Sequence, residues 1–180
     1  HGGTLEPLVT PGLTRWVGGA AFSLGLILVC VAGGELFTGN NLLVMAAVDA
    51  RVTWSAVLRN WLLVYLGNSI GALGIAGLMH MGGLWASGNG DHERGALAIA
   101  EAKASLPFMT ALARGVLCNL LVCLAVWMTY ACRSVVDRVM VIVPPVAAFV
   151  ALGCEHSVAN MYFLPVGWLI SPTFDLGAAL

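Results

Sequence analysis

Charged side chains are scarce in this chain, and their scarcity excludes most soluble architectures. Asp, Glu, Lys and Arg make up 9% of the 180 residues, whereas hydrophobic residues make up 59%. A soluble domain carries about 25% charged residues, and a water-soluble globule as apolar as this one would expose large hydrophobic patches. With a mean hydropathy of +0.91, the composition indicates a polytopic membrane protein.

Basic clusters and metal-ligand motifs are also missing. The Lys and Arg residues are scattered and the formal net charge is −1, so the sequence lacks the electrostatic footprint of a nucleic-acid-binding protein. His156 follows Glu155 directly with no second histidine nearby, which does not match metalloenzyme patterns such as H-E-x-x-H. The cysteines lie in or beside apolar runs, as small apolar fillers. We therefore expect no metal, no cofactor and no enzymatic activity.

The N-terminal stretch HGGTLEPLVTPG lacks a basic region leading into a short apolar segment, and such a region is typical of a secretory signal peptide. The chain also lacks an initiator Met. From these two absences we expect the sequence to begin within a protein.

Four apolar runs of membrane scale form what we predict to be one transmembrane domain over residues 1–180. A straight span needs about 20 residues, so two of the runs are too long for a single crossing. The long runs are the first and the fourth, and each is interrupted by polar residues, near 34–41 and near 153–159. The runs cover residues about 13–48, 56–81, 108–131 and 139–170.

The connections between the runs are polar. The stretch ASGNGDHERG, residues 86–95, contains Gly, Asn and Asp and predicts an aqueous loop. Aromatic side chains near the predicted span ends are typical of an interfacial belt. These are Trp16, Trp54, Trp85, Tyr130 and Trp168.

The two interruptions share the pattern G-x-E-x-x-x-x-N, from Gly33 to Asn40 and from Gly153 to Asn160. The runs that carry them are separated by three crossings and must traverse the membrane in opposite directions, which indicates an inverted repeat. Broken helices in such repeats meet at the membrane midplane, where non-helical backbone is tolerated only inside the protein or along a cavity. We expect the two breaks to face each other across a pathway, in a six-span protein of which this chain lacks the first and last spans.

Several collinear blocks of the sequence resemble the formate/nitrite transporter family, and within it the bacterial formate channels. The resemblance covers nearly the whole chain. The blocks are FSLGLILV (22–29), ELFTGN (35–40), RNWLLVYLGNSIGA (59–72), AKASLP around Lys103, RGVLCNLLVCLAVWM (114–128) and EHSVANM (155–161).

The resemblance implies an all-α polytopic membrane protein: an aquaporin-like, inverted-repeat helical bundle with two broken helices, in which each protomer has six spans and its own pore. It also implies a homopentamer in the lipid bilayer of the bacterial cytoplasmic (inner) membrane. This chain matches spans two to five and departs from the family pattern by lacking the two flanking spans. By the same resemblance, residues 1–11 and 86–106 lie on the periplasmic side.

Site residues follow from the resemblance position by position. His156 is then the central pore histidine, with Thr38 as its neighbour across the pore. Lys103 matches a basic residue of the outer vestibule, and Asn119 and Asn160 match polar residues near the pore. An asparagine on the sixth span belongs to the family pattern and has no counterpart here.

Two further groups of residues complete the prediction. The resemblance makes Phe22 and Leu26 one hydrophobic constriction, with Phe149 contributing to the other. Glu35 and Glu155, at equivalent places in the two breaks, are interpreted as structural groups that accept hydrogen bonds from freed backbone N–H groups. Read without the resemblance, the three apolar residues indicate only packing within the spans.

The predicted function is passage of small monovalent weak-acid anions, most of all formate. Moving such an anion through an apolar pore costs many kcal/mol, and protonation removes most of that barrier. Lys103 and the half-helix ends would attract the anion, and the His156 imidazole can donate to it or relay a proton near neutral pH. Nitrite, hydrosulfide and short-chain carboxylates such as acetate and lactate remain alternatives, as do a neutral-solute channel for water or glycerol and a structural membrane module.

Overall fold

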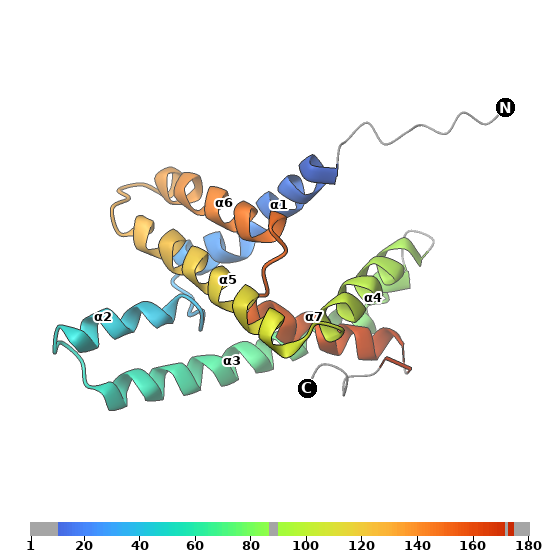
Figure 1. The fold of residues 1–180 in the computed structure, drawn as a ribbon, viewed down its shortest axis with the longest axis horizontal. Helices are drawn as coiled ribbons and strands as arrows, with labels where there is room; N and C mark the ends of the chain where they lie inside the picture. The colour runs from blue at the N-terminus through green and yellow to red at the C-terminus, as the bar shows by residue number, and fades with distance from the viewer. Residues whose placement is uncertain (1–10, 87–89, 172, 175–180) are drawn as a thin grey trace. The chain divides into compact units, whose positions relative to one another are not determined.

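The computed structural model describes residues 11–86, 90–171 and 173–174, and it is helical throughout, with no β-strand among these residues (Figure 1). The predicted all-α class is confirmed. In chain order the elements are α1 (Pro11–Ala32), the 3₁₀ turn η1 (Asn40–Leu42), α2 (Leu43–Val48), α3 (Trp54–Met81), the 3₁₀ turn η2 (Leu84–Ala86), α4 (Asp91–Ala104), α5 (Phe108–Thr129), α6 (Val135–Ala151) and α7 (Ser157–Ile170).

Among the described residues, three helices are long and apolar enough to cross a membrane: α1 from Arg15 to Ala32, all of α3, and all of α5. The fourth apolar run consists of α6 and α7, which are too short individually and follow each other across residues 152–156. The first run is likewise divided, into α1 and the short α2, with residues 33–39 outside any α-helix. Residues 1–10 and 87–89, which belong to the expected periplasmic segments, lie outside the described part of the chain.

The chain divides into two compact units and passes between them after Glu35, within α5 and after Cys154. Unit 1 contains residues 1–35 and 117–154, and unit 2 contains residues 36–116 and 155–180. In unit 1, α1 packs against α6, and in unit 2, α7 packs against α3 and α4.

Close packing in unit 1 depends on a glycine. A Cβ atom placed on Gly19 of α1 would lie 2.7 Å from the Cα atom of Ala147 on α6, which is closer than two carbon atoms can approach. The Phe22 and Phe149 rings also pack edge to face, with centroids 5.8 Å apart. Two small residues therefore allow the helix backbones to approach closely, as is common for helices in membranes.

Unit 2 contains a helix that the sequence did not predict. Part of the stretch expected to be an aqueous loop begins α4, which buries three alanines spaced by four residues, Ala96, Ala100 and Ala104. Ala100 lies against Gly167 of α7, where a Cβ atom would come within 2.6 Å of the alanine methyl group. Alanines contribute little to the hydropathy of a segment, so the polar composition of this stretch gave no indication of a buried helix face.

The two helix breaks begin in the same way. Gly33 follows α1 with φ of 76°, and Gly153 follows α6 with φ of 68°, a left-handed conformation that glycine adopts without strain. In both, the next residue donates its backbone N–H to the carbonyl five residues earlier, from Gly34 to Val29 and from Cys154 to Phe149. These are Schellman caps, so the first glycine of each G-x-E pattern ends a half-helix.

Candidate functional site

The side chains of Thr38 and His156 lie within hydrogen-bond distance in unit 2. Thr38 Oγ1 is 3.3 Å from His156 Nε2, and the two residues are 4% and 7% exposed. Thr38 belongs to the loop between α1 and η1, and His156 directly precedes α7. The structure thus brings together the two residues that the resemblance placed across the pore from each other, although their roles in transport stay a prediction.

His156 is also the N-cap of α7. Its Nδ1 atom accepts a hydrogen bond from the backbone N–H of Ala159 at 3.0 Å, one of the helix N-terminal donors that has no partner within the helix. A neutral imidazole carries one proton, so with Nδ1 accepting, the proton is on Nε2. The Nε2–H group is then a donor directed at Thr38, and the cap fixes both the tautomer and the orientation of the ring.

Glu155, the residue before His156, is held by two side chains. Lys103 Nζ on α4 donates to Glu155 Oε2 at 2.7 Å, and Asn160 Nδ2 donates to the same oxygen at 2.9 Å. Lys103 also lies over the Phe163 ring, 5.7 Å from its centroid. A buried carboxylate needs such partners because burial of an isolated charge is very costly.

The structure shows partners for Glu155 and Lys103 that the sequence did not predict. Glu155 was expected to accept backbone N–H groups, and here two side chains donate to it. Lys103 was expected to attract anions in a vestibule, and here its ammonium group pairs with Glu155. The counterpart Glu35 is exposed and belongs to unit 1, so the two glutamates of the repeat have different surroundings.

Residues on α3 that sequence reasoning missed hold the loop that carries Thr38. Asn68 accepts the backbone N–H of Phe37 at 3.0 Å, and the Trp61 indole N–H donates to the carbonyl of Asn40 at 3.0 Å. The available signal was the asparagine side chain within an apolar span, because polar groups at that depth are costly without partners.

The predicted constriction residues lie in unit 1. Leu26 and Phe149 are buried, whereas Phe22 is 38% exposed. The sequence assigned Phe22 and Phe149 to different constrictions, but their rings are in direct edge-to-face contact. The structure therefore groups these two residues together, and a role in gating remains a prediction.

The two predicted pathway asparagines each have a buried amide oxygen without a hydrogen-bond partner in the described part of the chain, Asn119 Oδ1 and Asn160 Oδ1. The Asn119 amide nitrogen contacts Cys123 Sγ at 3.8 Å within α5. Buried amide oxygens normally have a donor, so each oxygen is suited to a small molecule that carries an O–H or N–H group.

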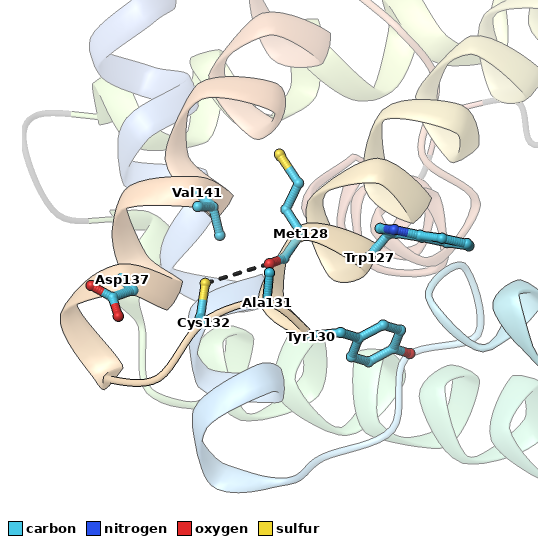
Figure 2. Close-up of a pocket in the computed structure, with 7 residues that line it drawn as sticks. All are labelled: Trp127, Met128, Tyr130, Ala131, Cys132, Asp137 and Val141. Atoms are coloured by element: carbon cyan, nitrogen blue, oxygen red, sulfur yellow. Dashed lines mark hydrogen bonds between the residues drawn. The ribbon is translucent and has the colours of Figure 1, made fainter.

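A cavity of about 630 Å³ in unit 1 is lined by none of these residues. It opens at the turn between α5 and α6, and its wall includes the Cys132 thiol, which donates to the Met128 carbonyl at 3.4 Å (Figure 2). The lining is mostly apolar and contains no predicted pathway residue, so we do not assign the substrate pathway to it. Its residues are Trp127, Met128, Tyr130, Ala131, Cys132, Asp137 and Val141.

Metal-binding clusters are not found in the described residues, where no three His, Cys, Asp or Glu side chains are grouped so that they could hold an ion.

Comparison with known proteins gives consistent results. The family model described as "Formate/nitrite transporter" matches residues 2–180. The formate channel FocA of Escherichia coli is 46% identical over 167 residues, which cover 91% of this chain and 59% of that protein. A probable formate transporter of Methanothermobacter thermautotrophicus is 38% identical and covers 92% of this chain and 66% of its own length.

Solved structures show the same similarity. A structure described as a pentameric formate channel with formate bound matches with a TM-score of 0.83 and 43% identity, over 89% of this chain and 63% of that chain. An ion channel of the same family matches with a TM-score of 0.79 and 32% identity, over 90% of this chain and 64% of that one. The chain thus spans about three fifths of the E. coli relative and of these structures.

Proposed function

Because the chain belongs to the formate/nitrite transporter family, we propose that it forms the pore of a channel for small monovalent weak-acid anions, most of all formate. The observation that carries this proposal is the buried contact of Thr38 Oγ1 with His156 Nε2 at 3.3 Å. This contact joins a hydroxyl and an imidazole, which can both hydrogen-bond to a carboxylate or a carboxylic acid. Polar groups inside membrane spans mark substrate or ion pathways.

We propose that the substrate passes His156 as the neutral acid. An anion that enters a narrow apolar pore loses hydration at a cost of several kcal/mol, and uptake of a proton removes the charge. The buried Oδ1 atom of Asn160 has no donor in the described part of the chain. A protonated acid has an O–H group that can donate a hydrogen bond to this oxygen, whereas the anion has no such group.

The helix cap favours one of the two roles that the sequence left open for His156. A second proton on the ring would occupy Nδ1 and break the hydrogen bond from Ala159, which costs about 1 kcal/mol for a helix cap. The neutral ring already presents Nε2–H as a donor. We therefore propose that His156 donates a hydrogen bond to an oxygen of the substrate and does not itself supply the proton.

Lys103 contributes to this pathway as part of an ion pair. The ammonium group is held by Glu155 at 2.7 Å, so the pair carries little net charge and attracts anions less strongly than a free lysine would. An arriving anion competes with Glu155 for the same N–H groups. In the same proposal, hydrated ions are excluded at two hydrophobic constrictions, one formed by Phe22 and Leu26 and the other with a contribution from Phe149.

Transport assays in proteoliposomes test this function. The purified full-length protein should take up formate at a rate that rises as the pH falls from about 7 to about 5, as expected for a weak acid that crosses in neutral form. Liposomes without protein give the background rate. A protein that passes water or glycerol but neither formate nor nitrite over this range would be a neutral-solute channel and would contradict the proposal.

The identity of the anion and the assembly are part of the same proposal. Nitrite, hydrosulfide and short-chain carboxylates share the charge and weak acidity of formate, and competition against formate uptake ranks them. Since the solved neighbour is described as pentameric, we propose a homopentamer in the bacterial cytoplasmic membrane with one pore per copy. Native mass spectrometry from detergent should give five copies.

A further inference from the structure

One face of α3 carries polar and aromatic side chains that contact the loop around Thr38. Trp61, Tyr65 and Asn68 are spaced by four and by three residues, which places them on the same side of the helix. Most of this helix is exposed and apolar, with only Val57 and Ala76 buried. These polar side chains are therefore exceptions on an apolar helix, and within a membrane they need hydrogen-bond partners.

Three hydrogen bonds join α3 to the loop within unit 2, two of them from this face and one from the adjacent Asn60. The backbone N–H of Phe37 donates to Asn68 Oδ1 at 3.0 Å, and the Trp61 Nε1–H donates to the carbonyl of Asn40 at 3.0 Å. The Asn40 side-chain amide donates to Asn60 Oδ1 at 2.9 Å. The first gives the Phe37 N–H group an acceptor, and a backbone N–H group without one is costly in a membrane. The second adds to the hydrogen bond that the Asn40 carbonyl already accepts from the Leu43 N–H group.

Aromatic contacts strengthen the same attachment. The Phe37 ring packs edge to face against Tyr65, with centroids 5.2 Å apart, and against Trp61, with centroids 6.5 Å apart. Edge-to-face pairs at these distances are favourable beyond the area that they bury. Phe37 is thus held at its backbone by Asn68 and at its ring by two neighbours on the same helix.

We propose that Asn68 and Trp61 are positioning residues that hold Thr38 against His156. They bind Phe37 and Asn40, which lie one residue before and two residues after Thr38, so the backbone between the two attachments has little freedom. Thr38 then stays within 3.3 Å of His156 Nε2 without a regular helix to support it. The consequence for transport rests on the proposed function, whereas the attachment of the loop does not.

Hydrogen exchange of the loop amides tests the attachment in the full-length protein. Asn68→Leu and Trp61→Phe each remove one hydrogen bond and keep most of the volume, so exchange of residues 36–42 should become roughly tenfold faster. Trp54→Phe is the matched control, because Trp54 belongs to the same helix and is 54% exposed; it should leave the loop unchanged. Unaltered exchange in Asn68→Leu and Trp61→Phe would overturn the inference.

Two further measurements separate positioning of Thr38 from a general loss of structure. Asn68→Asp keeps an acceptor oxygen and should restore loop exchange to within about twofold of the parent, while α6 amides should exchange at the parent rate in every variant. Failure of this conservative variant to restore the loop would contradict the role of the Asn68 oxygen.

A double-mutant cycle tests the effect on transport. If Asn68 acts through Thr38, then Asn68→Leu should lower formate uptake in the parent but have almost no further effect in Thr38→Val. Independent, multiplicative losses would show that Asn68 does not act through Thr38. A parent protein that transports no formate would contradict the proposed function alone, since loop exchange still decides whether α3 positions the loop.

Discussion

Lys103 Nζ on α4 lies 2.7 Å from Glu155 Oε2, and this ion pair connects α4 to the residue that precedes His156. The side chains are only 16% and 11% exposed, so water screens the pair weakly. Asn160 donates to the same carboxylate oxygen. The backbone at the start of α7 is therefore held from α4, and with it the position of the His156 ring.

Removal of one partner from this pair should destabilise the protein strongly. Lys103→Gln leaves the Glu155 carboxylate buried without its counter-charge, and a broken buried pair costs about 3 kcal/mol or more. Arg94→Gln is the matched control on the same helix, because the Arg94 and Asp91 side chains are 71% and 76% exposed and such surface pairs contribute less than about 1 kcal/mol. Thermal unfolding in detergent measures both changes.

The double variant Lys103→Gln with Glu155→Gln sharpens this test. It removes both charges, so it should be more stable than either single variant, because no unpaired charge remains. Additive losses would show that the two residues contribute independently and that the ion pair does not hold the start of α7.

Substitution of His156 separates its capping role from its role in the pathway. Asparagine is among the best N-cap residues, and loss of a cap to alanine costs about 1 kcal/mol. His156→Asn should therefore keep the stability of the parent, whereas His156→Ala should lose about that amount. Denaturant unfolding monitored by circular dichroism distinguishes the two variants.

Transport by the same variant tests whether His156 titrates. If the ring acts as a neutral donor through Nε2, His156→Asn should transport formate more slowly but with the same dependence on pH, because protonation of the acid sets that dependence. Parallel pH profiles of uptake for parent and variant are the expected result. A profile that flattens in His156→Asn would show that the ring relays protons.

Gly19 and Gly18, adjacent in α1, should respond in opposite directions to alanine. At Gly19 the new methyl group would meet the backbone of Ala147 at 2.7 Å, whereas at Gly18 it would meet no described atom within 4 Å beyond its chain neighbours and its own helix backbone. Overpacking costs about 1–3 kcal/mol, while alanine at an open helix position gains up to about 1 kcal/mol over glycine. Thermal unfolding should place Gly19→Ala below the parent and Gly18→Ala at or above it; equal effects would rule out close α1–α6 packing at Gly19.

The parts of the fold that sequence reasoning anticipated are those with a local signal. Gly33 and Gly153 stand where two overlong apolar runs must break, and each adopts a positive φ that glycine tolerates best. By contrast α4 has no apolar run, because its buried face consists of alanines, and its packing against α7 is a tertiary effect. Length and hydropathy could not reveal it.

The same distinction between local signals and tertiary contacts applies to the site. Thr38 and His156 were identified from the resemblance, and the structure places them in contact. The pairing of Lys103 with Glu155 depends on residues separated by 52 positions, and no pattern in the sequence indicates which carboxylate the chain's single lysine meets. The attachment of the Thr38 loop by Asn68 and Trp61 was missed for the same reason, since it requires knowing which face of α3 meets the loop.

The start of α6 should respond to acid because of Asp137, which precedes the apolar run beginning near residue 139. The Ser134 side chain and the backbone N–H groups of Arg133 and Ser134 hydrogen-bond to it and lower the pKa of the Asp137 carboxyl below its usual value. With Ser134 Oγ accepting the Asp137 backbone N–H at 3.1 Å, the two residues form a capping box.

A lowered pKa in the folded state means that the ionised carboxylate contributes stability above the pKa of the unfolded chain, about 4. This contribution is lost as the pH falls through the lower, folded value. Asp137→Asn should therefore reduce the thermal midpoint at pH 7, and the difference from the parent should shrink as the pH is lowered below about 4. Asp49→Asn, at an exposed residue whose carboxylate lies 3.5 Å from exposed Arg51, serves as the control. A difference between parent and Asp137→Asn that stays constant with pH would mean that the carboxylate charge does not stabilise the start of α6.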